Sequence, residues 1–218
     1  MARPARVSPE QILAAAASEF AERGYAGARV DRIARRAAVN KAMLYYHFAS
    51  KRQLYRTLLR RMFARAADRL NAIAGSAAAP PAKIDRVIAE LAALIQEHPV
   101  FPAIMMREVA EGGAHLDRPT LAALAAVPRA VAAIVEDGVR RRAFRPIHPV
   151  FAYFSLLAPI VFYLAGAPIR REISSLHLMD LRALSPADFV RAIAYPTVTF
   201  SVFVVSFPRM SMTLITII

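Results

Sequence analysis

Residues 40–48, NKAMLYYHF, gather side chains that could bind a polyanion. Leu44 and Phe48 are four residues apart, so in a helix both point to one side, toward a core. Most of the other side chains then lie on different faces: Lys41, Ala42, Met43, Tyr45, Tyr46 and His47. Ammonium, phenol and imidazole groups can bond phosphate oxygens, and small apolar side chains can contact the methyl group of thymine. We expect one tyrosine to pack against a preceding helix, and the remaining surface to enter a nucleic-acid groove.

Two longer helices are needed to hold this short one in place. Ser8-Pro9 supplies an N-cap residue and a proline at the first position of a helix that Gly24 should end. A further helix is predicted from Lys51 to about Asn71. The inward-facing residues are Ile12, Leu13, Ala16, Ala17 and Phe20 in the first helix and Leu54, Leu58, Met62 and Leu70 in the other.

A second short helix precedes the groove-facing one. Val30, Ile33, Ala34 and Ala37 share one of its faces, while Arg29, Arg32, Arg35 and Arg36 take the others. Ala38-Val39 makes the turn, and Asn40 is a suitable N-cap for the third helix. The pattern of helix, turn and helix is typical of DNA-binding proteins that insert the second helix into the major groove.

Positive charge is concentrated in the same part of the chain. Residues 1–70 hold 15 Lys and Arg against 5 Asp and Glu, whereas the remaining 148 residues hold 14 against 11. A polyanionic partner therefore belongs to the N-terminal third, and DNA, RNA or an anionic membrane would each fit the charge.

This stretch resembles the DNA-binding domain of the TetR/AcrR family of bacterial transcriptional regulators. The matching pieces keep their order over about 50 positions: Ile12 with Phe20, Arg23-Gly24-Tyr25, Val30, Ile33-Ala34, Val39, residues 44–48, Ser50-Lys51 and Leu54. The resemblance implies an all-helical, homodimeric regulator that binds double-stranded operator DNA. It also implies a variable C-terminal helical domain for dimerisation and for a small effector.

The resemblance also implies roles for individual residues. Lys41, Ala42 and Met43 would contact bases, and Tyr45, Tyr46 and His47 would contact phosphates. Lys51 would bind a phosphate with help from a helix N-terminus. Two positions depart from the family pattern. Arg29 stands where a capping Ser or Thr is usual, and could itself reach the DNA backbone. Ala38 stands where Gly is usual, which would cost roughly 1 kcal/mol in a left-handed conformation.

A loop at residues 75–81, GSAAAPP, divides a DNA-binding domain (1–72) from a helical ligand-binding and dimerisation domain (82–194). Within the second domain we predict helices at 82–97, 100–111, 119–143, 148–166 and 186–194. Bulky apolar residues on these helices could line an effector pocket, although such residues are more often ordinary core. The candidates are Met105, Met106 and Phe154.

Other chemistries find little support in the sequence. The chain has no cysteine, which excludes disulfides, thiolate metal sites and cysteine nucleophiles. Glu108, Glu111 and His115 have the residue types of a metal site, but Gly112-Gly113 should end the helix before His115. We therefore expect no metal and no cofactor, and no catalytic constellation that would make an enzyme.

Residues 147–169 contain no Asp, Glu, Lys or Arg and are long enough to span a bilayer. Pro149 and Pro159, and the domain context, instead favour a helix buried partly by a second subunit. A membrane-associated protein anchored here and by the C-terminal tail is the alternative. Since residues 1–11 lack an apolar signal core, we expect a cytoplasmic protein without membrane contact.

The tail, residues 195–218, differs in composition from the rest of the chain. It lacks Ala, Gly, Asp and Glu and holds four of the six Thr, and Val198, Phe200, Val202 and Val204 alternate as in a strand. The tail is either foreign to the fold, for instance through a shifted reading frame, or a divergent hydrophobic end. Both forms would be prone to aggregation.

Overall fold

The computed structural model describes residues 8–180, and over that range the chain forms nine α-helices and no strand. The first four are α1 (Pro9–Gly27), α2 (Val30–Arg36), α3 (Lys41–His47) and α4 (Lys51–Ala74). They are followed by α5 (Pro80–Glu97), α6 (Phe101–Ala110), α7 (Arg118–Arg140), α8 (Pro149–Ala165) and α9 (Ala167–Ser175). The all-α prediction is confirmed. The helix predicted at 186–194 and the tail 195–218 lie outside the described residues.

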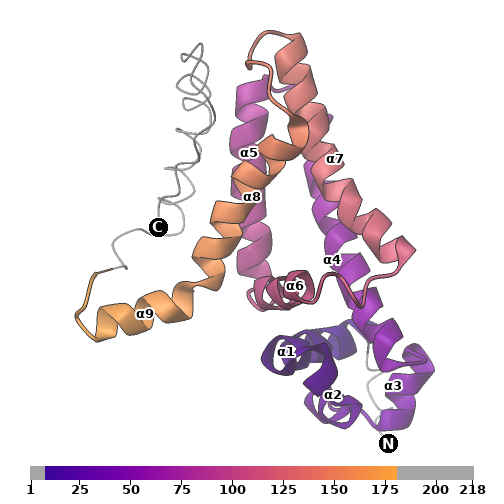
Figure 1. Ribbon diagram of the computed structural model, residues 1–218. Coiled ribbons are helices and arrows are strands. Elements are labelled where there is room, and N and C mark those ends of the chain that lie inside the picture. The colour runs from indigo at the N-terminus through magenta and orange to yellow at the C-terminus, as the bar shows by residue number, and fades with distance from the viewer. Residues whose placement is uncertain (1–7, 181–218) are drawn as a thin grey trace, which may run out of the picture.

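Figure 1 shows α1, α2 and α3 grouped at one end of the molecule, next to the start of α4. From there α4 runs into the other half, where α5, α7 and α8 pack along one another. Helix α6 lies across the junction and contacts α1, so the two halves meet along α1, α4 and α6.

Side-chain caps fix the start of the helices that matter for the N-terminal half. Ser8 and Gln11 form a reciprocal capping box at the start of α1. The Asn40 carboxamide oxygen accepts the Met43 amide at 2.7 Å, and Ser50 caps α4. The caps predicted at Ser8 and Asn40 are confirmed. Each satisfies a backbone N–H that has no partner within its helix.

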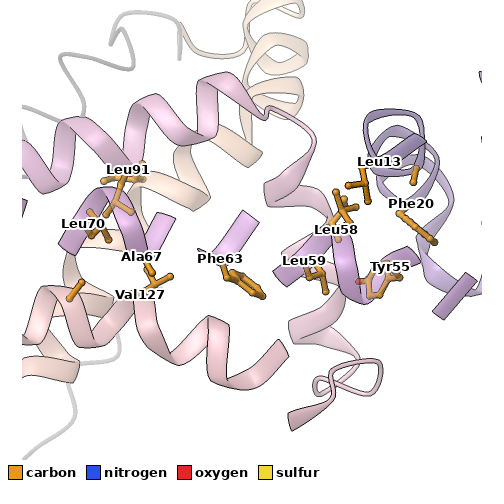
Figure 2. Packing of buried hydrophobic residues seen from close by; sticks show 14 of the residues in the cluster. Leu13, Phe20, Tyr55, Leu58, Leu59, Phe63, Ala67, Leu70, Leu91 and Val127 are labelled. Carbon is orange, nitrogen blue, oxygen red and sulfur yellow. The ribbon is translucent and has the colours of Figure 1, made fainter. Parts of the chain in front are cut away.

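One apolar core runs through both halves of the molecule. Buried side chains of α4 form its middle, and residues of α1, α5 and α7 pack onto them (Figure 2). Its labelled members are Leu13, Phe20, Tyr55, Leu58, Leu59, Phe63, Ala67, Leu70, Leu91 and Val127. Helix α4 therefore belongs structurally to both halves, and the domain division at residues 75–81 stays a prediction.

The helix boundaries predicted between residues 82 and 166 agree with the structure to within three residues. Helix α9 was not predicted, because Ala167-Pro168 follows Gly166 directly and starts a new helix without any loop. Gly24 interrupts α1 with φ of 68°, and one further turn follows it to Gly27.

Among the described helices, α7 is long and apolar enough to cross a membrane by length and composition. Two bent pairs meet the same test only when each is taken as one span: α5 with α6 at 98°, and α8 with α9 at 48°. Residues 147–169 thus do not form one straight span. Helix α8 buries Ala152, Tyr153, Leu156 and Ile160 within the core.

Candidate nucleic-acid interface

Helix α3 presents the predicted surface to solvent. Leu44 and Phe48 are buried, as their spacing predicts, and Lys41, Ala42 and Met43 are exposed. His47 is half-buried. The helix is thus anchored through one apolar side, which leaves its N-terminal residues open to a partner.

Both tyrosines of α3 are exposed, by 42% at Tyr45 and 83% at Tyr46, so the expectation that one packs into the core is wrong. The aromatic position beside α1 is filled instead by Tyr55 of α4. Its ring lies 4.8 Å from that of Phe20 in an edge-on arrangement and is 2% exposed. Two phenol groups are therefore available on the surface that the sequence assigns to phosphates.

An ion pair ties the start of α3 to α2. The Lys41 ammonium lies 2.9 Å from the Asp31 carboxylate, and both side chains are more than half exposed. The hydrogen bond between them lowers the pKa of Asp31 and raises that of Lys41. Lys41 thus keeps its positive charge and has an internal partner in the absence of DNA.

The turn between α2 and α3 contains a strained residue. Ala38 has φ of 54°, in the left-handed region where glycine is at no disadvantage. The family pattern usually has Gly here, and Ala38 adopts the left-handed conformation that favours Gly. For alanine this conformation costs roughly 1 kcal/mol. The backbone of this turn sets the angle at which α3 leaves α2.

Arg29 precedes α2 and supplies no side-chain cap, as expected. A buried acid compensates: Glu19 of α1, 2% exposed, accepts the Arg29 amide at 3.2 Å and lies 3.8 Å from the Arg32 guanidinium. Sequence reasoning missed this role of Glu19. The only signal was an acid adjacent to the buried Phe20. The Arg29 side chain itself is exposed, directly before α2.

Lys51 has internal partners that the sequence did not suggest. Its ammonium donates to the backbone oxygens of Ala28 at 2.8 Å and Ala26 at 3.2 Å, and it lies 4.8 Å from the centre of the Tyr25 ring. Partial burial lowers the pKa of this lysine. Lys51 therefore holds the connection between α1 and α2, and a phosphate contact from it stays a prediction.

The three predicted effector residues differ in exposure, and their role as effector contacts stays a prediction. Met105 is half-buried, and Met106 and Phe154 are 46% and 58% exposed. An open surface hollow of about 520 Å³ lies between α4 and α5 and contains none of these three residues. It is lined mainly by polar and small residues: Arg69, Ala72, Ile73, Ser76, Arg86, Glu90, Ala93 and Glu97.

Comparison with known proteins places these features in a family. Residues 12–58 match the bacterial regulatory proteins of the tetR family, and residues 80–188, half of the chain, match the tetracyclin repressor-like C-terminal domain. The chain belongs to the TetR family. It is a DNA-binding transcriptional regulator, and the resemblance seen in residues 9–55 is confirmed.

Relatives with assigned roles agree with this. The transcriptional repressor NicS of Pseudomonas putida is 29% identical over 179 residues, covering 79% of this chain and 81% of NicS. The transcriptional activator FasR of Mycolicibacterium smegmatis is 51% identical over 51 residues, and the match spans only 23% of either protein. Activators and repressors therefore both occur among the relatives.

The fold also matches solved regulators. The Bacillus subtilis regulator FadR, in complex with stearoyl-CoA, superposes with a TM-score of 0.70 over 88% of this chain and 98% of its own. At 16% identity this similarity shows the fold alone.

Proposed function

We propose that this TetR-family protein is a homodimeric repressor that binds a palindromic operator through one α3 per half-site. The observation that carries the proposal is the solvent face of α3. In the bound state Lys41, Ala42 and Met43 meet base edges, where Ala42 and Met43 suit thymine methyls. The phosphate contacts come from Arg29, Tyr45, Tyr46, His47 and Lys51.

Dimerisation is proposed to use α8. Phe151, Phe154 and Phe162 are 65%, 58% and 76% exposed, whereas the core side of the same helix is buried. Such an apolar stripe is costly in water and is typical of a subunit interface. For two half-sites, the α3 helices of the dimer must lie about 34–36 Å apart, one turn of DNA.

The effector is proposed to be a small, mostly apolar molecule bound by the C-terminal half. Stearoyl-CoA, the ligand of the B. subtilis FadR structure, belongs to this chemical class and serves as a probe. In some dimers the two α3 helices would not have the spacing that the operator requires. An effector that binds such dimers more tightly would increase their population, and the operator would be released. Met105, Met106 and Phe154 remain candidate contacts.

We place the protein in the cytoplasm, without membrane contact. The membrane-associated alternative would need α7, or the bent α8–α9 pair, to leave the core in which both α7 and α8 bury side chains. Cell fractionation separates the two: recovery in the soluble fraction without detergent supports the regulator, and a detergent requirement contradicts it.

The function is tested by selecting bound sequences from random duplex DNA and titrating the selected duplex in a gel shift. Tyr46→Ala should weaken binding by roughly fivefold to tenfold, since a phosphate hydrogen bond contributes about 1 kcal/mol. Tyr46 is 83% exposed, so the fold does not depend on it. Val109→Ala, at an exposed position on α6 (68%), should leave the affinity unchanged. Failure to enrich any palindrome would contradict the proposal.

A further inference from the structure

Three side chains of metal-binding type meet where α6 ends. Glu108 lies on the last turn of α6, Glu111 is the C-cap residue that follows the helix, and His115 lies in the connection to α7. One carboxylate oxygen from each acid and an imidazole nitrogen all lie within 4.8 Å of one another. The cluster lies at the junction of the two halves, against Tyr25 of α1 and Tyr55 of α4.

Two glycines bring the histidine back to the acids. Helix α6 ends before His115, as the sequence predicts. The expectation that this would keep His115 away from the two acids is wrong. Gly112 and Gly113 have φ of 66° and 77°, which turns the chain back on itself. The Gly113 amide closes the turn on the Glu108 carbonyl at 2.9 Å.

The ligand spacing suits one shared ion. Nδ1 of His115 lies 3.2 Å from Oε2 of Glu108 and 3.2 Å from Oε2 of Glu111. Ligands about 2.0–2.2 Å from a tetrahedral ion lie about 3.3 Å from each other. A charge-assisted hydrogen bond between imidazolium and carboxylate is usually shorter, about 2.7–2.9 Å. Two of the three ligand separations are therefore close to what coordination requires, and the third, between the two carboxylates, is at most 4.8 Å.

Glu108 is held in place from both sides. Its carboxylate is 2% exposed, with Oε1 accepting the His115 amide at 2.9 Å and Oε2 accepting the Tyr55 hydroxyl at 2.8 Å. Arg56 fixes the other side of the loop by donating to the His115 carbonyl at 2.8 Å. Hydrogen bonds of this kind orient metal ligands and are commonly as important as the ligands themselves.

We propose that Glu108, Glu111 and His115 bind one divalent transition-metal ion, and that Zn²⁺ fits the set best. One imidazole and two carboxylates are ligands that Zn²⁺ accepts, and three protein ligands leave a fourth position for water. The ion also neutralises two carboxylates that share a partly buried site. This site is additional to the proposed operator and effector sites.

The test uses the full-length protein, stripped with a chelator, desalted and titrated calorimetrically with ZnCl₂. One Zn²⁺ should bind per chain. Glu111→Gln, at a 45% exposed position, and His115→Ala should each weaken binding about tenfold or more. His98→Ala removes another partly buried histidine, outside the cluster, and should leave this binding unchanged.

Substitution with Co²⁺ gives a second readout, because visible absorption reports direct ligation. The band should appear in the wild type and be lost in His115→Ala. Absence of Zn²⁺ binding in the wild type, or equal binding in all variants, overturns the proposal. The gel shift of the metal-free protein tests operator binding separately, so the two proposals can fail independently.

Discussion

Lys41, the first residue of α3, forms an ion pair with Asp31 of α2 at 2.9 Å. The cation that we propose to contact bases is thus engaged within the protein before DNA arrives. Binding through Lys41 must exchange this carboxylate for the DNA, and a negative charge stays beside the DNA surface after the exchange. The ion pair holds the Lys41 side chain in position, and it also competes with the proposed contact between Lys41 and DNA.

Asp31→Asn should therefore strengthen operator binding. Removing the competing charge frees Lys41 and reduces repulsion of the phosphates, and exposed pairs of this kind correspond to roughly a twofold to fivefold effect. A gel-shift titration at fixed salt measures it. Asp68→Asn makes the same charge change at an exposed position on α4 and should have a smaller effect. Equal effects of the two changes would show that only net charge matters.

Ala38→Gly should stabilise the protein by about 0.5–1 kcal/mol, because glycine adopts φ of 54° without the steric cost that alanine has. Urea unfolding followed by circular dichroism measures the free energy. The matched control is Ala72→Gly, the same change at an exposed position within α4, which should destabilise by up to about 1 kcal/mol. Destabilisation by both changes would argue against strain at the turn.

Lys51→Met keeps the aliphatic chain and removes the ammonium. It should lower the free energy of unfolding by about 1–2 kcal/mol, since the carbonyls of Ala26 and Ala28 lose a charged donor. The salt dependence of operator binding decides the second role. A slope smaller by about one marks the proposed phosphate contact. An unchanged slope shows that Lys51 acts only by holding the connection between α1 and α2.

Gly138→Ala should destabilise the protein by about 1–3 kcal/mol through overpacking. A Cβ at Gly138 would lie 2.0 Å from Cδ2 of Phe144, whose ring covers the end of α7. Gly27→Ala, where a Cβ would meet only Arg23 at 3.4 Å, is the control and should change stability little. In a background of Phe144→Ala the cost of Gly138→Ala should shrink, and persistence of the full cost would point away from this ring.

Local patterns were sufficient to predict the solvent face of α3. Leu44 and Phe48 are buried because their spacing places them on one side of the helix, and Asn40 caps it because its side chain needs only a neighbouring amide. Both predictions depend only on residues that lie within about one helical turn of each other. Helix α9 escaped prediction because no loop separates it from α8.

Contacts between distant residues could not be predicted in this way. Glu19 reaches the amide of Arg29, Lys51 reaches the carbonyl of Ala28, and Tyr55 reaches Glu108 across 53 positions of sequence. Each depends on how helices cross, which periodicity does not determine. Periodicity also cannot separate core from an open surface, so the sequence did not indicate that Phe154, a candidate effector contact, is 58% exposed.

The continuous core along α4 bears on how this protein can be dissected. A fragment cut after residue 72 would retain α1 to α3 but would expose the side of α4 formed by Phe63, Ala67 and Leu70. Loss of that burial removes several kcal/mol of hydrophobic stabilisation. A free-standing DNA-binding fragment, or a chimera joined at residues 75–81, would therefore need a replacement surface for α4. The DNA-binding half is a distinct region of the sequence, but its stability depends on contacts between α4 and the C-terminal half.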